Sequence, residues 1–167
     1  MIRPPAHAEL ELLLGIERDA GQAFADHGMP EIAAADPGTV AELEAYRAAG
    51  AAWVAVDAHN SPIGYIITSA IDDALHVDQV SVAPAHRGGR IGAALIDHVA
   101  ALARSSGRSA VTLTTFRDIP WNAPYYARLG FAELAADAWG PELRALVTHE
   151  PSAVPGDAPR VVMARPV

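Results

Sequence analysis

The chain has 167 residues, a usual length for one domain with its own core, and its 51% hydrophobic and 19% charged residues are typical of a folded protein. Its net charge of −8 disfavours nucleic acid as a partner, because binding phosphate requires a basic surface. Cysteine is absent, which excludes disulfides and cysteine ligands, and the histidines lack metal-ligand spacing, so we expect no metal.

The first fifty residues predict a short strand and two helices. Residues 2–4 open the sheet, residues 7–26 have the apolar spacing of a helix, and Asp36-Pro37 is typical of the start of a second helix that stops at Gly50. This region carries nine acids and three arginines. Solvated helix faces explain such a charge most simply, and a cleft for a cationic ligand is the alternative.

The middle of the chain predicts a meander of three strands over residues 52–56, 63–69 and 75–82. The last strand runs through Pro84 into a glycine turn and then into a helix with Ile91, Leu95, Val99 and Leu102 on one face. Because the first N–H groups of a helix lack partners, this turn has the geometry of an anion site. A plain Gly-Gly turn between two elements is the alternative.

The rest of the chain predicts further strands and helices in alternation. The helix after the turn is a crossover, so the strand at 110–115 is expected to lie parallel to the strand that ends at Val82. A short helix capped by Asp118 and ended by Gly130 follows. The remaining elements are a strand at 131–134, a helix at 141–148, a proline-rich loop at 151–159 and a strand at 160–164.

Two segments resemble the GNAT superfamily of acyl-CoA-dependent N-acyltransferases. Its pyrophosphate turn reads [Q/R]-x-x-G-x-[G/A], and this chain has Arg87-Gly88-Gly89-Arg90-Ile91-Gly92, with arginine at the fourth position instead of glycine. The second segment, Tyr126-Ala127-Arg128-Leu129-Gly130-Phe131, has the family's tyrosine-to-Gly-Phe spacing. The resemblance implies a single α/β domain over residues 1–167, with a mixed, mostly antiparallel sheet of six to seven strands, flanking helices and one parallel pair. Residues 1–50 then form the acceptor side, 52–131 the cofactor core and 132–167 a closing helix and strand.

The resemblance also implies acetyl-CoA as the acyl donor. The pantetheine arm is expected against the backbone of Val80, Ser81 and Val82, where an N–H would hold the thioester oxygen. The pyrophosphate is expected on Arg87, Gly88, Gly89, Arg90, Ile91 and Gly92. Asn122 is a further candidate, since its amide would reach a cofactor amide or phosphate.

Three residues are candidates for proton transfer. His76 and Asp78 alternate onto one face of their strand, where GNAT relatives often carry the base that takes a proton from an alkylammonium of pKa about 10.4. A satisfied strand histidine and an edge charge are the alternatives, and a water chain is a third candidate for the proton transfer. Tyr126 matches the family tyrosine that protonates the departing thiolate, and its alternative role is packing within its helix.

These features together predict an N-acetyltransferase that transfers an acetyl group to a primary amine by direct attack in a ternary complex. A small cationic amine is the expected acceptor. A protein N-terminus or lysine, a hydroxyl acceptor, and a non-catalytic acyl-CoA sensor are the alternatives. The apolar run at the N-terminus is too short for a signal peptide or a membrane span, so a cytoplasmic protein, as a monomer or homodimer, is expected.

Overall fold

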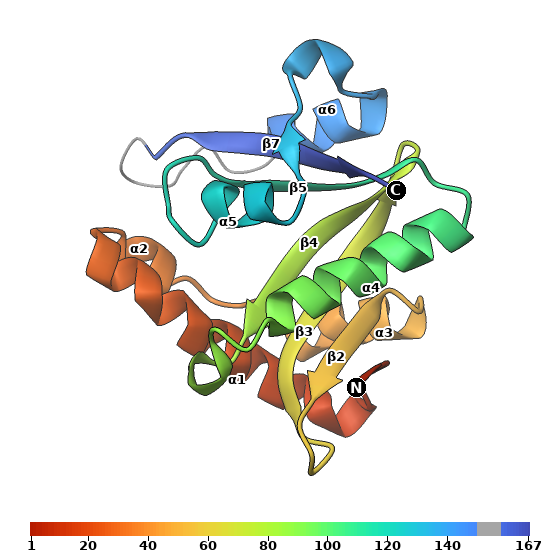
Figure 1. Ribbon diagram of the computed structural model, residues 1–167. Helices are drawn as coiled ribbons and strands as arrows, with labels where there is room; N and C mark the ends of the chain where they lie inside the picture. Colours follow the sequence, from red (N-terminus) through yellow and green to blue (C-terminus); the bar gives the residue numbers. More distant parts are fainter. Residues whose placement is uncertain (150–157) are drawn as a thin grey trace. The chain divides into compact units, whose positions relative to one another are not determined.

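The strands form one mixed sheet in the computed structural model, which describes residues 1–149 and 158–167. In this part of the chain the strand order is β1-β2-β3-β4-β5-β7-β6, as Figure 1 shows. Pairing is antiparallel for β1–β2, β2–β3, β5–β7 and β6–β7, and parallel for β4–β5. The predicted fold class is therefore confirmed. The strands are β1 (Ile2–Arg3), β2 (Ala52–Val56), β3 (Pro62–Ile71), β4 (Ala74–Val82), β5 (Ala110–Phe116), β6 (Ala132–Glu133) and β7 (Arg160–Pro166).

The helices follow the predicted order with short 3-10 turns between them. The α-helices are α1 (Leu10–Gly21), α2 (Pro30–Ala33), α3 (Val40–Ala48), α4 (Ile91–Ser105), α5 (Ala123–Arg128) and α6 (Pro141–His149). The 3-10 turns are η1 (His7–Glu9), η2 (Gln22–His27), η3 (Pro84–His86) and η4 (Ala136–Ala138). Residues 151–157 of the predicted proline-rich loop lie outside the described residues.

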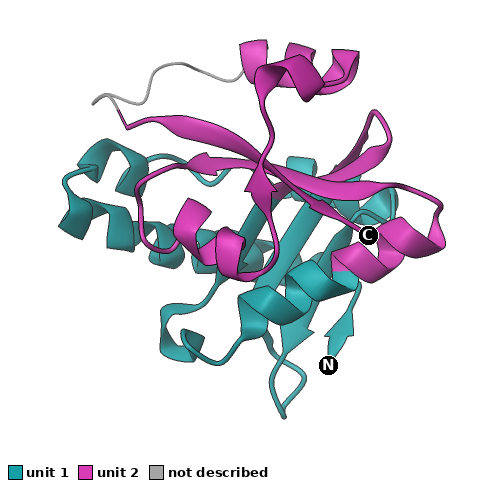
Figure 2. Ribbon diagram, turned by 45° about the horizontal axis from the view of Figure 1, so that its top comes forward, with its two compact units in different colours: residues 1–68, 79–98 teal, residues 69–78, 99–167 magenta. Residues whose placement is uncertain are grey.

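The described residues group into two compact units, which are coloured separately in Figure 2. Unit 1 comprises Met1–Thr68 and Gln79–His98, and unit 2 comprises Ser69–Asp78 and the chain from Val99 to its end. Strands β3 and β4 and helix α4 are each divided between the two units. The prediction of one domain over residues 1–167 stays a prediction.

Unit 1 has its core between α1, α3 and one face of β2 and β3. Alternate strand residues point to one face, and the helices meet them with leucines at helical spacing. The cluster consists of Leu10, Leu13, Leu14, Ile16, Leu43, Ala52, Val54, Val56, Tyr65 and Ile67. On the opposite strand face, the Trp53 ring contacts the His98 ring of α4 edge-on, with centroids 5.5 Å apart.

In unit 2, the turn between β3 and β4 also caps a helix. The Asp72 carboxylate accepts hydrogen bonds from the backbone N–H groups of Glu142 and Leu143, at 3.1 and 3.0 Å. The Glu142 carboxylate in turn accepts from the Asp72 N–H. A Cβ on Gly140 would clash with the Asp72 carboxylate, so a larger residue there would displace this carboxylate from its position. Asp72 thereby satisfies N–H groups of α6 that lack partners within the helix.

Two predicted helix starts are wrong. The second helix begins at Val40 and not at Asp36-Pro37, because Thr39 and Glu42 form a capping box: the Glu42 N–H donates to Thr39 Oγ1 at 3.2 Å, and the Glu42 carboxylate accepts from the Thr39 N–H at 2.7 Å. The cap of α5 is Asn122 and not Asp118. The short helix α2 was not anticipated.

Candidate functional site

The glycine turn lies directly before α4, at the place where the sequence predicts it. The Ala94 N–H donates to the Arg90 carbonyl at 2.9 Å, so the N–H groups of residues 91–93 precede the first intrahelical bond. Gly88 has φ +80°, and a Cβ there would meet nothing within 4 Å. A Cβ on Gly89 would lie 3.2 Å from the His86 carbonyl. Within the turn, the N–H groups of Arg87 and Gly89 donate to the Pro84 and His86 carbonyls, whereas those of residues 91–93 lie at the positive end of a fifteen-residue helix.

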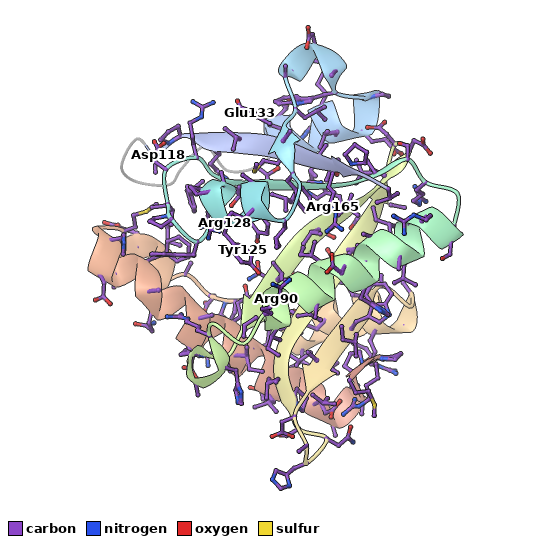
Figure 3. The ribbon with its side chains drawn as sticks, in the orientation of Figure 1. Arg90, Asp118, Tyr125, Arg128, Glu133 and Arg165 are labelled. Atoms are coloured by element: carbon purple, nitrogen blue, oxygen red, sulfur yellow. The ribbon has the colours of Figure 1, made fainter. Side chains whose placement is uncertain are left out.

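Arg90 departs from the family pattern, and its backbone shows the reason glycine is preferred there. Its φ is +58°, in the left-handed region that glycine enters without cost and other residues rarely adopt. Arg90 lies at the start of α4 (Figure 3). Arg90 is exposed there.

Arg87 fixes the turn to the first helix of unit 1. Its guanidinium donates to the Ala20 carbonyl of α1 at 3.0 Å. One of its nitrogens is therefore used within the protein, which gives this side chain a positioning role in addition to the cofactor contact predicted from the sequence.

The end of β4 packs closely on β3. A Cβ on Gly64 would lie 2.9 Å from the Ser81 carbonyl and 3.3 Å from Val82 Cγ2, so glycine permits this approach. The Gln79 side-chain amide donates to Ser81 Oγ at 2.8 Å, and the Ser81 side chain is buried. The predicted contribution of Val80, Ser81 and Val82 therefore rests on their backbone.

The parallel ladder of β4 with β5 covers only the first part of β4. The paired residues run from Ala74 with Ala110 to Val77 with Leu113. Beyond Val77, β4 continues to Val82 outside this ladder. The sequence analysis expects the pantetheine arm against Val80, Ser81 and Val82, which belong to this part of β4.

Asp78 and His76 have different surroundings within unit 2. The Ser69 hydroxyl donates to Asp78 Oδ2 at 2.6 Å, and Asp78 is partly exposed. His76 is only 2% exposed, and its Nδ1 lies 2.9 Å from the hydroxyl of the buried Thr112. Burial lowers the pKa of His76 to about 4.

Tyr126 lies in α5 among other rings. Its ring meets those of Tyr125 and Phe131 edge-on, with centroids 5.4 and 5.8 Å away. Burial, and to a smaller degree Tyr125, raises the pKa of the Tyr126 phenol. The hydroxyl therefore keeps its proton at neutral pH. Both tyrosines belong to α5, where Figure 3 labels Tyr125 next to Arg128, whose guanidinium lies 5.8 Å from that ring.

Asn122 holds a buried polar atom without a partner in the described part of the chain. Its Oδ1 accepts a hydrogen bond from Thr115 Oγ1 at 2.9 Å, whereas its Nδ2 is buried and makes no hydrogen bond there. An unsatisfied buried amide is unfavourable, and a ligand carbonyl or phosphate would satisfy it.

The structure therefore gathers Val80–Val82 and the turn residues Arg87–Gly92 in unit 1, and holds His76, Asp78, Asn122 and Tyr126 in unit 2.

Sequence reasoning missed a further polar pair in unit 1, in which the Tyr65 hydroxyl donates to the Glu17 carboxylate. The spacing in the sequence could have indicated this pair, since Glu17 continues the helical spacing of the buried residues Leu10, Leu13 and Leu14.

Residues 1–149 and 158–167 contain no group of three or more histidines or acids that could hold a metal ion. Among the same residues, no helix is long and apolar enough to cross a membrane.

Comparison with known proteins gives a family and a set of similar folds. The model of the acetyltransferase (GNAT) family matches residues 17–131. The structure of Rv2747 from Mycobacterium tuberculosis in complex with CoA is similar over 100% of this chain and 99% of that chain, with a TM-score of 0.73 and 18% identity. The ribosomal-protein-S18-alanine N-acetyltransferase from Escherichia coli is similar over 100% and 93% of the chains, with a TM-score of 0.68 and 17% identity. A GNAT family acetyltransferase from Brucella melitensis in complex with acetyl-CoA is similar over 85% and 89%, with a TM-score of 0.59 and 24% identity.

Proposed function

The chain belongs to the GNAT family of acetyltransferases, and from this premise we propose that it transfers an acetyl group from acetyl-CoA to a primary amine by direct attack in a ternary complex. The observation that carries the proposal is the helix start that follows the glycine turn, where the N–H groups of residues 91–93 precede the first intrahelical bond, inside the matched region. A covalent acyl-enzyme is not required.

Acetyl-CoA supplies the activated acetyl thioester, and the residues of the turn fit its diphosphate. Backbone N–H groups at the start of α4 would hold the phosphates, with the Arg90 guanidinium as a further positive charge. Gly88 supports this assignment because its open space admits a phosphate close to the backbone. The unpartnered Nδ2 of Asn122 would donate to a carbonyl of the pantetheine arm or to a phosphate.

The backbone of Val80, Ser81 and Val82 would hold the thioester oxygen. These residues lie outside the ladder between β4 and β5, so their N–H groups do not serve that ladder. A peptide N–H aimed at the oxygen stabilises the negative charge that develops there during acyl transfer.

We assign the base to Asp78 in preference to His76. Asp78 is partly exposed and is oriented by the Ser69 hydroxyl. His76 is buried and hydrogen-bonded to Thr112, and burial lowers its pKa to about 4. A side chain without access to solvent or substrate is a poor proton acceptor whatever its pKa. Asp78 would take the proton that the ammonium group must lose before attack.

Tyr126 would return a proton to the departing thiolate, whose thiol has a pKa of about 8.5. Tyr126 is partly exposed, and its phenol, whose pKa is raised, is protonated at neutral pH and therefore has the proton to give. Transfer depends on the charge that develops on sulfur as the thioester bond breaks.

The acceptor is proposed to be a small cationic amine. The acidic N-terminal third of the chain supports this choice. The fold is shared with a ribosomal-protein N-acetyltransferase, so a protein N-terminus is the second candidate. Cytoplasmic residence and a homodimer remain predictions, for cell fractionation and sedimentation to test.

Release of free thiol tests the function directly. The protein is incubated with acetyl-CoA and, separately, with small diamines, amino sugars, amino acids and peptides with free N-termini. We expect thiol release with at least one amine and a mass increase of one acetyl group on that amine. Binding of CoA without release in the presence of any acceptor would instead favour a sensor.

A further inference from the structure

We propose that Glu17 of α1, held by the hydroxyl of Tyr65, binds a second positive charge of the acceptor, one that is not on the acetylated nitrogen. The inference rests on the proposed function and narrows its substrate class to amines with at least two cationic groups.

The place of Glu17 in its helix is unusual for an acid. Helix α1 buries Leu10, Leu13 and Leu14 against the strands of unit 1, and Glu17 follows on the same stripe at helical spacing. Glu17 is consequently half-buried, whereas Glu11 and Asp19 of the same helix are exposed. Acids are almost never fully buried unless they are paired, and Glu17 is buried in part.

Tyr65 orients the Glu17 carboxylate through a hydrogen bond. This residue of β3 is completely buried, and its hydroxyl donates to Glu17 Oε2. Burial, followed by the charge of Glu17, raises the pKa of Tyr65, so the phenol acts only as a donor. A carboxylate accepts about four hydrogen bonds, and Tyr65 supplies one of them.

The charge of Glu17 has no cationic partner in the described residues. Their salt bridges use Glu9, Glu44 and Glu133. A half-buried carboxylate without a cation is unfavourable, and burial accordingly raises the pKa of Glu17. An ammonium group from a ligand would supply the missing charge.

Glu17 also lies on the side of α1 that meets the glycine turn. Residues three apart in a helix share a side, and Ala20, three residues after Glu17, receives the hydrogen bond of Arg87. The carboxylate and the anchor of the proposed cofactor turn thus belong to one side of one helix. This is a suitable place for recognising an acceptor beside its acyl donor.

Kinetics with two matched amines test the proposal. The substrates are 1,4-diaminobutane and butylamine, which differ by one ammonium group. We expect Glu17→Gln to raise the KM for the diamine at least tenfold, to change kcat less than twofold, and to leave kcat/KM for butylamine within twofold. Tyr65→Phe, which keeps the ring, should raise the diamine KM by two- to fivefold. Glu17→Asp should recover part of the loss, and Glu11→Gln, an exposed acid of the same helix, should match the wild type.

Calorimetry separates this proposal from the proposed function. CoA is expected to bind Glu17→Gln with the wild-type Kd, and the diamine is expected to bind the wild-type CoA complex at least tenfold more tightly than the variant complex. The ratio of kcat/KM for the diamine to kcat/KM for butylamine is compared between Glu17→Gln and the wild type. If Glu17→Gln binds CoA normally and this ratio is unchanged, the role of Glu17 is overturned. If the wild type releases no thiol with any amine, the transferase function is overturned, but the cation site is not. Calorimetric binding of the diamine then decides whether Glu17 forms a cation site.

Discussion

Ser69 and Asp78 are joined by a hydrogen bond of 2.6 Å from the serine hydroxyl to the Oδ2 of the aspartate. The donor comes from β3 and the acceptor from β4, nine residues later. The bond fixes the orientation of the carboxylate that we propose as the base.

Asp78→Asn should lower kcat about 100-fold at neutral pH, because the amide cannot accept a proton from the acceptor ammonium. Activity should recover as the pH rises towards the acceptor pKa of about 10, where the free amine needs no base. Ser69→Ala should lower kcat by about three- to tenfold through lost orientation, and Ser105→Ala is the control. A pH profile of kcat that is the same in Asp78→Asn and the wild type would remove Asp78 from the mechanism.

Gly88→Ala should weaken CoA binding at least tenfold in calorimetry. The matched control is Gly50→Ala, since both glycines have positive φ, of +80° and +68°, and open space for a Cβ. Each substitution therefore carries a similar backbone cost of about 1–2 kcal/mol. Similar CoA affinities in the two variants would show that the cofactor does not lie on this turn.

Tyr126→Phe should lower kcat about 10- to 100-fold and leave the Kd for CoA unchanged, because phenylalanine keeps the ring contact with Phe131 and loses only the proton donor. Tyr125→Phe serves as the control on the same helix. Full activity of Tyr126→Phe in the thiol-release assay would leave Tyr126 with a packing role.

His76 should make stability depend on pH. Burial lowers its pKa to about 4 from 6.5, so between these values the unfolded chain binds a proton that the folded chain does not. The free energy of unfolding should be unaffected by His76 above pH 6.5 and should fall by at most about 3 kcal/mol as the pH drops towards 4. His76→Asn, whose amide can still bond Thr112, should remove this dependence in urea unfolding. The same slope in the variant would contradict the prediction.

Arg90→Gly should relieve the left-handed backbone at φ +58° and raise the free energy of unfolding by about 1 kcal/mol. If the guanidinium lies at a cofactor phosphate, the same variant should bind CoA several-fold more weakly, and raised salt should narrow the difference. Thermal melting and calorimetry measure the two effects. A variant that is less stable than the wild type would contradict the backbone argument.

Much of the fold is encoded locally and was predictable. The strands at 52–56 and 75–82 and the helix after the glycine turn appear within a residue or two of their predicted bounds, because apolar periodicity and glycine punctuation act over a few neighbouring residues. The parallel pairing of β4 and β5 was also predictable, since a crossover helix connects them.

Competing local signals account for the wrong helix starts. Asp36-Pro37 and Thr39 with Glu42 are both typical helix starts, and the sequence does not rank them. The capping box sets the start of α3, because its two reciprocal hydrogen bonds satisfy N–H groups at the N-terminal end of this helix.

By itself, the sequence determined the order of the strands, the glycine turn at Arg87–Gly92 and the family, since each depends on residues close together in the chain. Only the tertiary structure decided that β7 lies between β5 and β6, that His76 is buried while Asp78 is partly exposed, and that Tyr65 meets Glu17 across 48 residues. The reason is physical: strand insertion, burial and side-chain pairing depend on which distant segments pack together, and local propensities do not encode that choice.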